Sequence, residues 1–73
     1  MSELTHLKRL LVNGEEREFM QQSTLLEIMQ TLKIADKVMA AAVNTKIIKA
    51  SEWENFIPKD GDRIELLHFV GGG

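Results

Sequence analysis

The sequence predicts a single α+β domain, spanning residues 1–73, with one main helix packed across a mixed sheet of four to five strands. Three features predict this class: an Asn-Gly pair between two strand-like runs, one amphipathic helical stripe, and further strand-like runs after it. A hairpin, a helix and more strands, in that order, are typical of a helix laid on one face of a sheet. A chain of 73 residues has room for one small core.

The first element is a hairpin. The run "LKRLLV", Leu7 to Val12, is followed by Asn13-Gly14 and then by "EEREFM", Glu15 to Met20. Asn-Gly is the strongest short hairpin signal, because both residues tolerate positive φ angles. The polar start of the return strand indicates that one of its faces is partly exposed.

The main helix is predicted from about Leu25 to Lys33. Thr24 and Glu27 form a capping box, in which each side chain bonds a free backbone amide of the first turn. Apolar residues at spacings of three and four then make one stripe, which we assign to the core. The stripe consists of Leu25, Ile28, Met29 and Leu32.

Two more strands are predicted in the middle of the chain. "VMAAAVN", Val38 to Asn44, has the length of a buried strand, and Asn44-Thr45 turns it into "KIIK", Lys46 to Lys49. "SEWENF" predicts a single helical turn capped by Ser51. Trp53 and Phe56 are expected to close one end of the core.

The last strand, "RIELLHFV", follows a turn, "PKDGD", in which Gly61 can take a positive φ angle. Alternation places Ile64, Leu66, His68 and Val70 on one face, and Arg63, Glu65, Leu67 and Phe69 on the other. The second face begins charged and ends apolar, beside the terminal glycines. Leu67 and Phe69 either pack under a loop or form a docking patch for a partner.

Composition excludes several classes of function. The net charge is −2 with the two signs interspersed, which argues against nucleic acid and against a basic membrane anchor. No apolar run approaches the roughly 18 residues of a membrane span, and the start lacks a secretory signal, so a cytoplasmic location is expected. The chain has no cysteine, and His6 and His68 are far apart, so no metal site is expected.

The sequence ends on Gly71, Gly72 and Gly73, directly after the last strand. Glycine has the most backbone freedom to lose and no side chain to bury. A tail without side chains can thread a channel in which any Cβ atom would clash. The alternative is a disordered end without a function.

The motifs together resemble the sulfur carrier proteins of thiamine biosynthesis, the ThiS family, which belongs to the ubiquitin-like β-grasp superfamily. The resemblance runs from about Lys8 to Gly73 and is most specific at Asp60 to Asp62 and at Gly72-Gly73. Asn44 after the alanine-rich strand and Glu52-Trp53 add to it. It implies a β-grasp fold with a flexible tail at residues 70–73.

The resemblance also implies a function. The Gly73 carboxylate becomes an acyl adenylate on an E1-like adenylating enzyme (ThiF-type), which uses ATP and Mg²⁺. A persulfide donor enzyme then supplies sulfur for a C-terminal thiocarboxylate, and thiazole synthase (ThiG-type) receives that sulfur. The chain is thus expected to be a carrier without an active site or cofactor of its own. Gly71 to Gly73 enter the partners' active sites, while Leu67, Phe69 and Val70 dock.

Two alternatives stay open at this point. The small subunit of molybdopterin synthase has the same fold and the same tail, so the end product could be molybdopterin. Another ubiquitin-like modifier or binding module could act through its sheet face or join its tail to lysines. The conjugates that a modifier forms have a higher mass, whereas a carrier exchanges one oxygen for sulfur.

Overall fold

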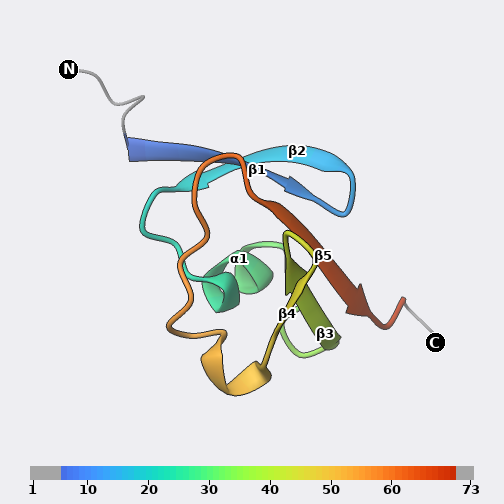
Figure 1. The fold of residues 1–73 in the computed structure, drawn as a ribbon. Helices are drawn as coiled ribbons and strands as arrows, with labels where there is room; N and C mark the ends of the chain where they lie inside the picture. Colours follow the sequence, from blue (N-terminus) through green and yellow to red (C-terminus); the bar gives the residue numbers. More distant parts are fainter. Residues whose placement is uncertain (1–5, 71–73) are drawn as a thin grey trace.

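The computed structural model describes residues 6–70, which form one five-stranded mixed sheet with a helix across one face (Figure 1). The strand order is β2-β1-β5-β3-β4. The central pair, β1 and β5, is parallel and the other neighbours are antiparallel. The elements are β1 (Leu7–Val12), β2 (Glu15–Met20), α1 (Leu25–Thr31), β3 (Val38–Val43), β4 (Lys46–Ile48), the 3-10 helix η2 (Ala50–Glu52) and β5 (Arg63–His68). The α+β class and the predicted sheet are confirmed.

The first hairpin has the predicted turn. Asn13 has a φ angle of 50° and Gly14 one of 86°, and Val12 pairs with Glu15 directly across the turn. Positive φ at both central residues is the geometry that suits the twist of a two-residue hairpin. Within β2 only Phe19 is buried, as expected of a strand with an exposed face.

The helix begins as predicted and ends two residues early. Thr24 and Glu27 make both bonds of the capping box. At the other end Lys33 has a φ angle of 64°, its N–H donates to Gln30, and the Ile34 N–H donates to Met29, each at 3.0 Å. These two bonds are a Schellman motif, which usually has glycine at the left-handed position. Because lysine stands there instead, no glycine marks the end of the helix, which stops at Thr31, two residues before the predicted end at about Lys33.

The core lies between the helix and the inner face of the sheet. Its helical part is the predicted stripe, except that Leu32 is only partly buried. Strand residues from all five strands complete it. The buried apolar residues are Leu10, Val12, Phe19, Leu25, Ile28, Met29, Ala41, Val43, Ile48, Ile64 and Leu66.

The connection after β4 differs from the prediction in one detail. The short helix η2 follows Lys49, which makes no side-chain cap bond, so the predicted Ser51 cap was wrong. Trp53 and Phe56 pack against the core as expected. The indole Nε1–H of Trp53 donates to the Ile48 carbonyl at 2.9 Å, which fastens this connection to the end of β4.

Lys8 is a buried cation on the inner face of β1, which sequence reasoning did not foresee. Its ammonium donates to the carbonyls of Ser23 and Pro58, both at 2.8 Å. Burial lowers the pKa of Lys8, while the charges of Asp62 and Glu27 act in the opposite direction. A buried charge is tolerated only when it is hydrogen-bonded, and these two carbonyls meet that need. Lys8 thereby joins β1 to the loops before α1 and β5.

The β3–β4 turn carries a strained residue. Asn44 and Thr45 have φ angles of 51° and 73°, so the predicted turn is confirmed. A β-branched residue at positive φ is an outlier, because its Cβ crowds the backbone. The hydroxyl of Thr45 donates to the Asn44 carbonyl but does not remove this crowding.

We expect Thr45→Gly to stabilise the domain. The left-handed conformation costs a non-glycine residue about 1–2 kcal/mol, part of which is offset by the greater freedom of glycine in the unfolded chain. A net gain of about 1 kcal/mol corresponds to a rise of about 4–8 °C in melting temperature. Thermal unfolding followed by circular dichroism measures it. Thr45→Ala, which keeps a Cβ, is the control, and an equal rise in that variant would contradict the argument.

Candidate functional site

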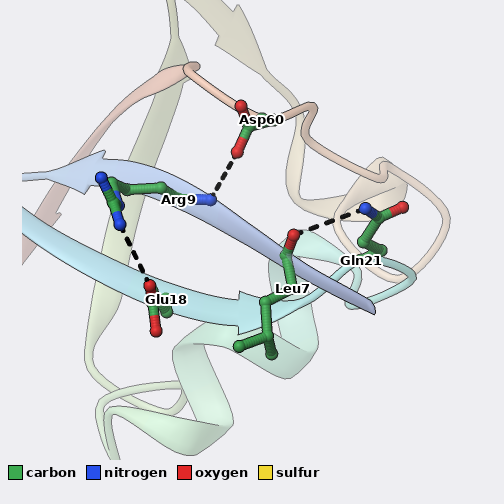
Figure 2. Close-up of polar contacts among 5 residues, drawn as sticks. All are labelled: Leu7, Arg9, Glu18, Gln21 and Asp60. Carbon is green, nitrogen blue, oxygen red and sulfur yellow. Dashed lines mark hydrogen bonds and ion pairs between the residues drawn. The ribbon is translucent and has the colours of Figure 1, made fainter. Parts of the chain in front are cut away.

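The position of β5 is set first by the turn at Asp60 to Asp62. A carboxylate oxygen of Asp60 accepts the Arg9 backbone N–H at 2.7 Å, and the Gly61 N–H donates to the Arg9 carbonyl at 2.8 Å. Gly61 has a φ angle of 90°, as predicted. Figure 2 shows Asp60 reaching the backbone of β1 beside the Arg9–Glu18 ion pair, whose atoms are 3.3 Å apart. The acidic turn therefore serves the structure by holding the start of β5 to β1.

Asp62 connects the same turn to the β3–β4 turn, which lies on the other side of β5 from β1. One carboxylate oxygen accepts the Lys59 N–H at 2.8 Å, and the other accepts the Asn44 side-chain amide at 2.9 Å. The Asn44 side-chain oxygen in turn accepts the Arg63 N–H at 2.9 Å. These bonds tie the first residue of β5 to the β3–β4 turn.

Asn13 extends the contact between β1 and β5 beyond the end of β1. Backbone pairing of the two strands covers only Leu11 with Arg63 and Val12 with Ile64. The Asn13 side chain then takes the place of a strand residue: its oxygen accepts the Leu66 N–H at 2.8 Å and its amide donates to the Leu66 carbonyl at 3.1 Å. Both turn asparagines thus fix the register of β5, and with it the point at which the strand ends.

The last strand ends at His68, two residues before the predicted end at Val70. The Phe69 N–H still donates to the Lys37 carbonyl, at 3.1 Å. β3 has an irregular register between Val38 and Ala40, so the ladder does not continue evenly past this point. The placement of Val70 with Ile64 and Leu66 on the core face was therefore wrong, and Val70 is 85% exposed.

The three predicted docking residues lie together at the end of β5 and all are open to solvent. Leu67 is 61% exposed and Phe69 is 65% exposed, like the still more open Val70. Packing beneath a loop of the described chain is thereby excluded for Leu67 and Phe69. Their use as docking residues stays a prediction.

The outer face of the sheet adds an apolar hollow beside Leu67. Ala40 pairs with Leu67, and Ala42 pairs with Ile47 of β4, so two small side chains lie between two large ones. These residues line a hollow together with Glu65 and the Asn13–Gly14 turn. Ile47 is 69% exposed. Ile47 was predicted only as part of the "KIIK" strand, although alternation with the buried Ile48 indicates its outward direction.

We refer to Ile47, Leu67, Phe69 and Val70 as the apolar patch. Ile47 lies on β4 and Leu67 on β5, the two strands that flank β3, while Phe69 and Val70 belong to the segment that leads to the terminal glycines. The other end of the outer face is charged, with Arg9, Glu16, Glu18 and Asp60 lining a separate hollow. Charged side chains are therefore concentrated at the end of the outer face away from the apolar patch, where Leu7 and Leu11 line the same hollow.

The predicted tail residues Gly71, Gly72 and Gly73 lie outside the described residues. The part of the chain that is described contains no group of three or more His, Asp or Glu side chains that could hold a metal ion. No helix among residues 6–70 has the length and apolar character needed to cross a membrane.

The amino-acid sequence of this chain matches a known protein family. The ThiS family model matches residues 8–73. The sulfur carrier protein ThiS of Escherichia coli is 28% identical over 65 residues, which are 89% of this chain and 98% of that protein. A thiazole synthase of Paramagnetospirillum magneticum is 32% identical over 65 residues. The match covers 89% of this chain but only 20% of the length of that synthase.

The fold has a solved counterpart as well. The crystal structure of a thiamine biosynthesis protein, ThiS, from Geobacter metallireducens superposes with a TM-score of 0.72 at 29% sequence identity. The likeness covers 89% of this chain and 99% of that one. The ubiquitin-like β-grasp fold implied by the sequence motifs is confirmed.

Proposed function

Because the chain belongs to the ThiS family, we propose that it carries sulfur for the thiazole moiety of thiamine as a thiocarboxylate on Gly73. The observation that carries this proposal is the family match itself, which extends through the terminal glycines. The structure adds support, because β5 is held in register from both sides and delivers an exposed apolar segment to the start of that tail.

The chemistry begins with a carboxylate that is too poor an electrophile to react with sulfur. An oxygen of the Gly73 carboxylate attacks the α-phosphorus of ATP on an E1-like adenylating enzyme, and pyrophosphate leaves with its Mg²⁺. The terminal sulfur of a persulfide donor attacks the resulting acyl adenylate, and AMP leaves. A thiol reductant then cleaves the acyl disulfide and releases the thiocarboxylate. ATP and Mg²⁺ belong to the partner's reaction, and this chain acts as the co-substrate.

The chain's own contribution is to present its end. It has no cysteine, so a side-chain thiol cannot hold the sulfur. The glycines allow the backbone to approach reacting groups closely. We assign docking on the adenylating enzyme and on thiazole synthase to the apolar patch, because its members lie beside the tail and their exposed area can be buried by a partner.

Thiazole synthase is the partner with the most support. The Paramagnetospirillum magneticum relative is named a thiazole synthase, and one fifth of its length matches this chain. The adenylating enzyme and the persulfide donor are proposed from the family resemblance. No observation on residues 6–70 favours molybdopterin synthesis or protein conjugation over the thiamine pathway that the matched family indicates.

The experiment is an intact-mass measurement after incubation with the adenylating enzyme, ATP, Mg²⁺, a persulfide donor and a thiol reductant. We expect the chain to gain the mass difference between one sulfur and one oxygen. The gain should disappear when ATP is omitted, because the acyl adenylate then does not form.

Two other results would count against the proposal. Conjugates at higher mass would assign the chain to the ubiquitin-like modifiers. An unchanged mass with an adenylating enzyme that is active on another sulfur carrier would overturn the carrier function. Supply of the thiocarboxylate to purified thiazole synthase, followed by thiazole formation, distinguishes the thiamine pathway from the molybdopterin pathway.

A further inference from the structure

The end of β5 has one side without a strand partner among residues 6–70. β1 ends at Val12, whereas β5 continues to His68 and runs past the end of the first hairpin (Figure 1). The last backbone position of β5 that is bonded on this side is Leu66, and its partner is the Asn13 side chain. Asn13 therefore marks the point beyond which this side of β5 is open.

The backbone groups of His68 point to the open side. Backbone N–H and C=O groups alternate in direction along a strand, so Leu66 and His68 face the same way. On the side of β5 that faces β3, the bond beyond Leu67 is made by the Phe69 N–H, which donates to the Lys37 carbonyl. His68 is the partner of Val38 in that register, and the Phe69–Lys37 bond makes this a non-hydrogen-bonded pair, in which the backbone N–H and C=O of His68 face away from β3.

Space exists beside this edge. A hollow lies between the first hairpin and the end of α1, and it is lined by Asn13, Glu15, Arg17, Leu32, Ile34 and His68. A second hollow, beside Leu66 and Leu67, opens on the outer face of the sheet next to the same hairpin turn. An added strand would run between these two hollows.

The two outer edges of the sheet are protected against pairing, and this third edge is not. β2 carries Glu15, Glu16, Arg17 and Glu18, and β4 has only three residues. Charges and shortness are the features by which proteins prevent unwanted strand addition. The His68–Val70 edge has neither feature, because its flanking residues are the exposed and apolar Leu67, Phe69 and Val70.

We propose that the adenylating enzyme, which acts on the C-terminus, pairs one extended segment of its own backbone with the open edge at His68–Val70. The inference rests on the proposed function and specifies how the tail is aimed. The edge immediately precedes Gly71, so a strand paired there fixes the direction of the last three residues, each of which advances about 3.3–3.6 Å. Main-chain bonds give the affinity of strand addition, and pockets for alternate side chains give its specificity.

The test compares His68→Pro with His68→Ala. Both variants lose the imidazole, but only proline removes the backbone N–H at position 68. Proline is tolerated on a strand edge whose N–H has no partner in the free protein. We expect the dissociation constant for the adenylating enzyme, measured by calorimetry, to be about three- to tenfold weaker for His68→Pro than for His68→Ala, the effect of one lost hydrogen bond.

Amide hydrogen exchange of the unmodified chain provides a measurement that needs no variant. The His68 amide is expected to exchange more slowly in the complex. The Glu18 amide, which faces away from β1 on the edge of β2, should be unaffected and serves as the internal control. Equal affinities of the two variants, or an unprotected His68 amide in a complex that forms, would overturn strand addition. A missing sulfur gain in the intact-mass assay would instead overturn the proposed function, so the two failures are distinguishable.

Discussion

A single residue added after Gly73 is expected to abolish ATP–pyrophosphate exchange with the adenylating enzyme. The reaction needs a carboxylate oxygen in line with the α-phosphorus, and a misplacement of about 1 Å can cost a hundredfold in rate. One more residue moves the carboxylate by about 3.3–3.6 Å if the tail is extended. The exchange assay reports adenylation alone, before any sulfur is involved.

Substitutions within the tail give a graded version of the same experiment. Gly72→Ala leaves the carboxylate chemistry untouched, but its methyl group would collide with channel walls built around bare backbone. We expect a strong loss there and a milder one for Gly71→Ala, which lies nearer the mouth of the channel. Equal losses at both positions would correct only the depth of the channel. Full exchange by the extended chain would contradict the whole argument, because the carboxylate would then need no placement.

The local elements of the fold could be predicted because their signals are local. Asn13-Gly14 requires positive φ angles at two adjacent residues, and the Thr24–Glu27 capping box is completed within one turn of the chain. Both predictions are confirmed to the residue. Alternation along β5 likewise predicted that Leu67 lies opposite to the core face.

The features that sequence analysis missed depend on contacts between distant segments or on residues that break a local rule. Lys33 and Thr45 take left-handed conformations without being glycine, so neither the helix end nor the strain of the second turn had a sequence signal. In the sequence Lys8 looks like an ordinary polar strand residue. Its burial depends on the carbonyls of Ser23 and Pro58, which are distant in the sequence and accept its hydrogen bonds. The bonds from Asn13 to Leu66 join residues 53 apart, and they decide where the open edge of β5 begins.

The apolar patch gives the second large effect. Leu67→Asp is expected to weaken binding to the adenylating enzyme or to thiazole synthase by about thirtyfold or more, the effect of losing an interface anchor worth about 2 kcal/mol. The charge would have to be desolvated against an apolar partner surface, with Glu65 already on the same face of β5. Ile47→Asp is expected to act in the same direction, because Ile47 borders the same hollow.

The chain offers a closely matched control in Met20→Asp. Met20 is 60% exposed and Leu67 is 61% exposed, and both lie on outer strand positions, so the two aspartates should change the stability of the free domain to a similar small extent. They differ in location, because Met20 lies on β2, at the sheet edge separated from β5 by β1. If a general loss of surface hydrophobicity weakened binding, the two variants would behave alike. If the patch beside the tail docks, only Leu67→Asp loses affinity while both melt near the wild-type temperature. Equal affinities of Leu67→Asp and wild type for both enzymes would show that the patch does not dock and that the tail alone, with its open strand edge, makes the contact.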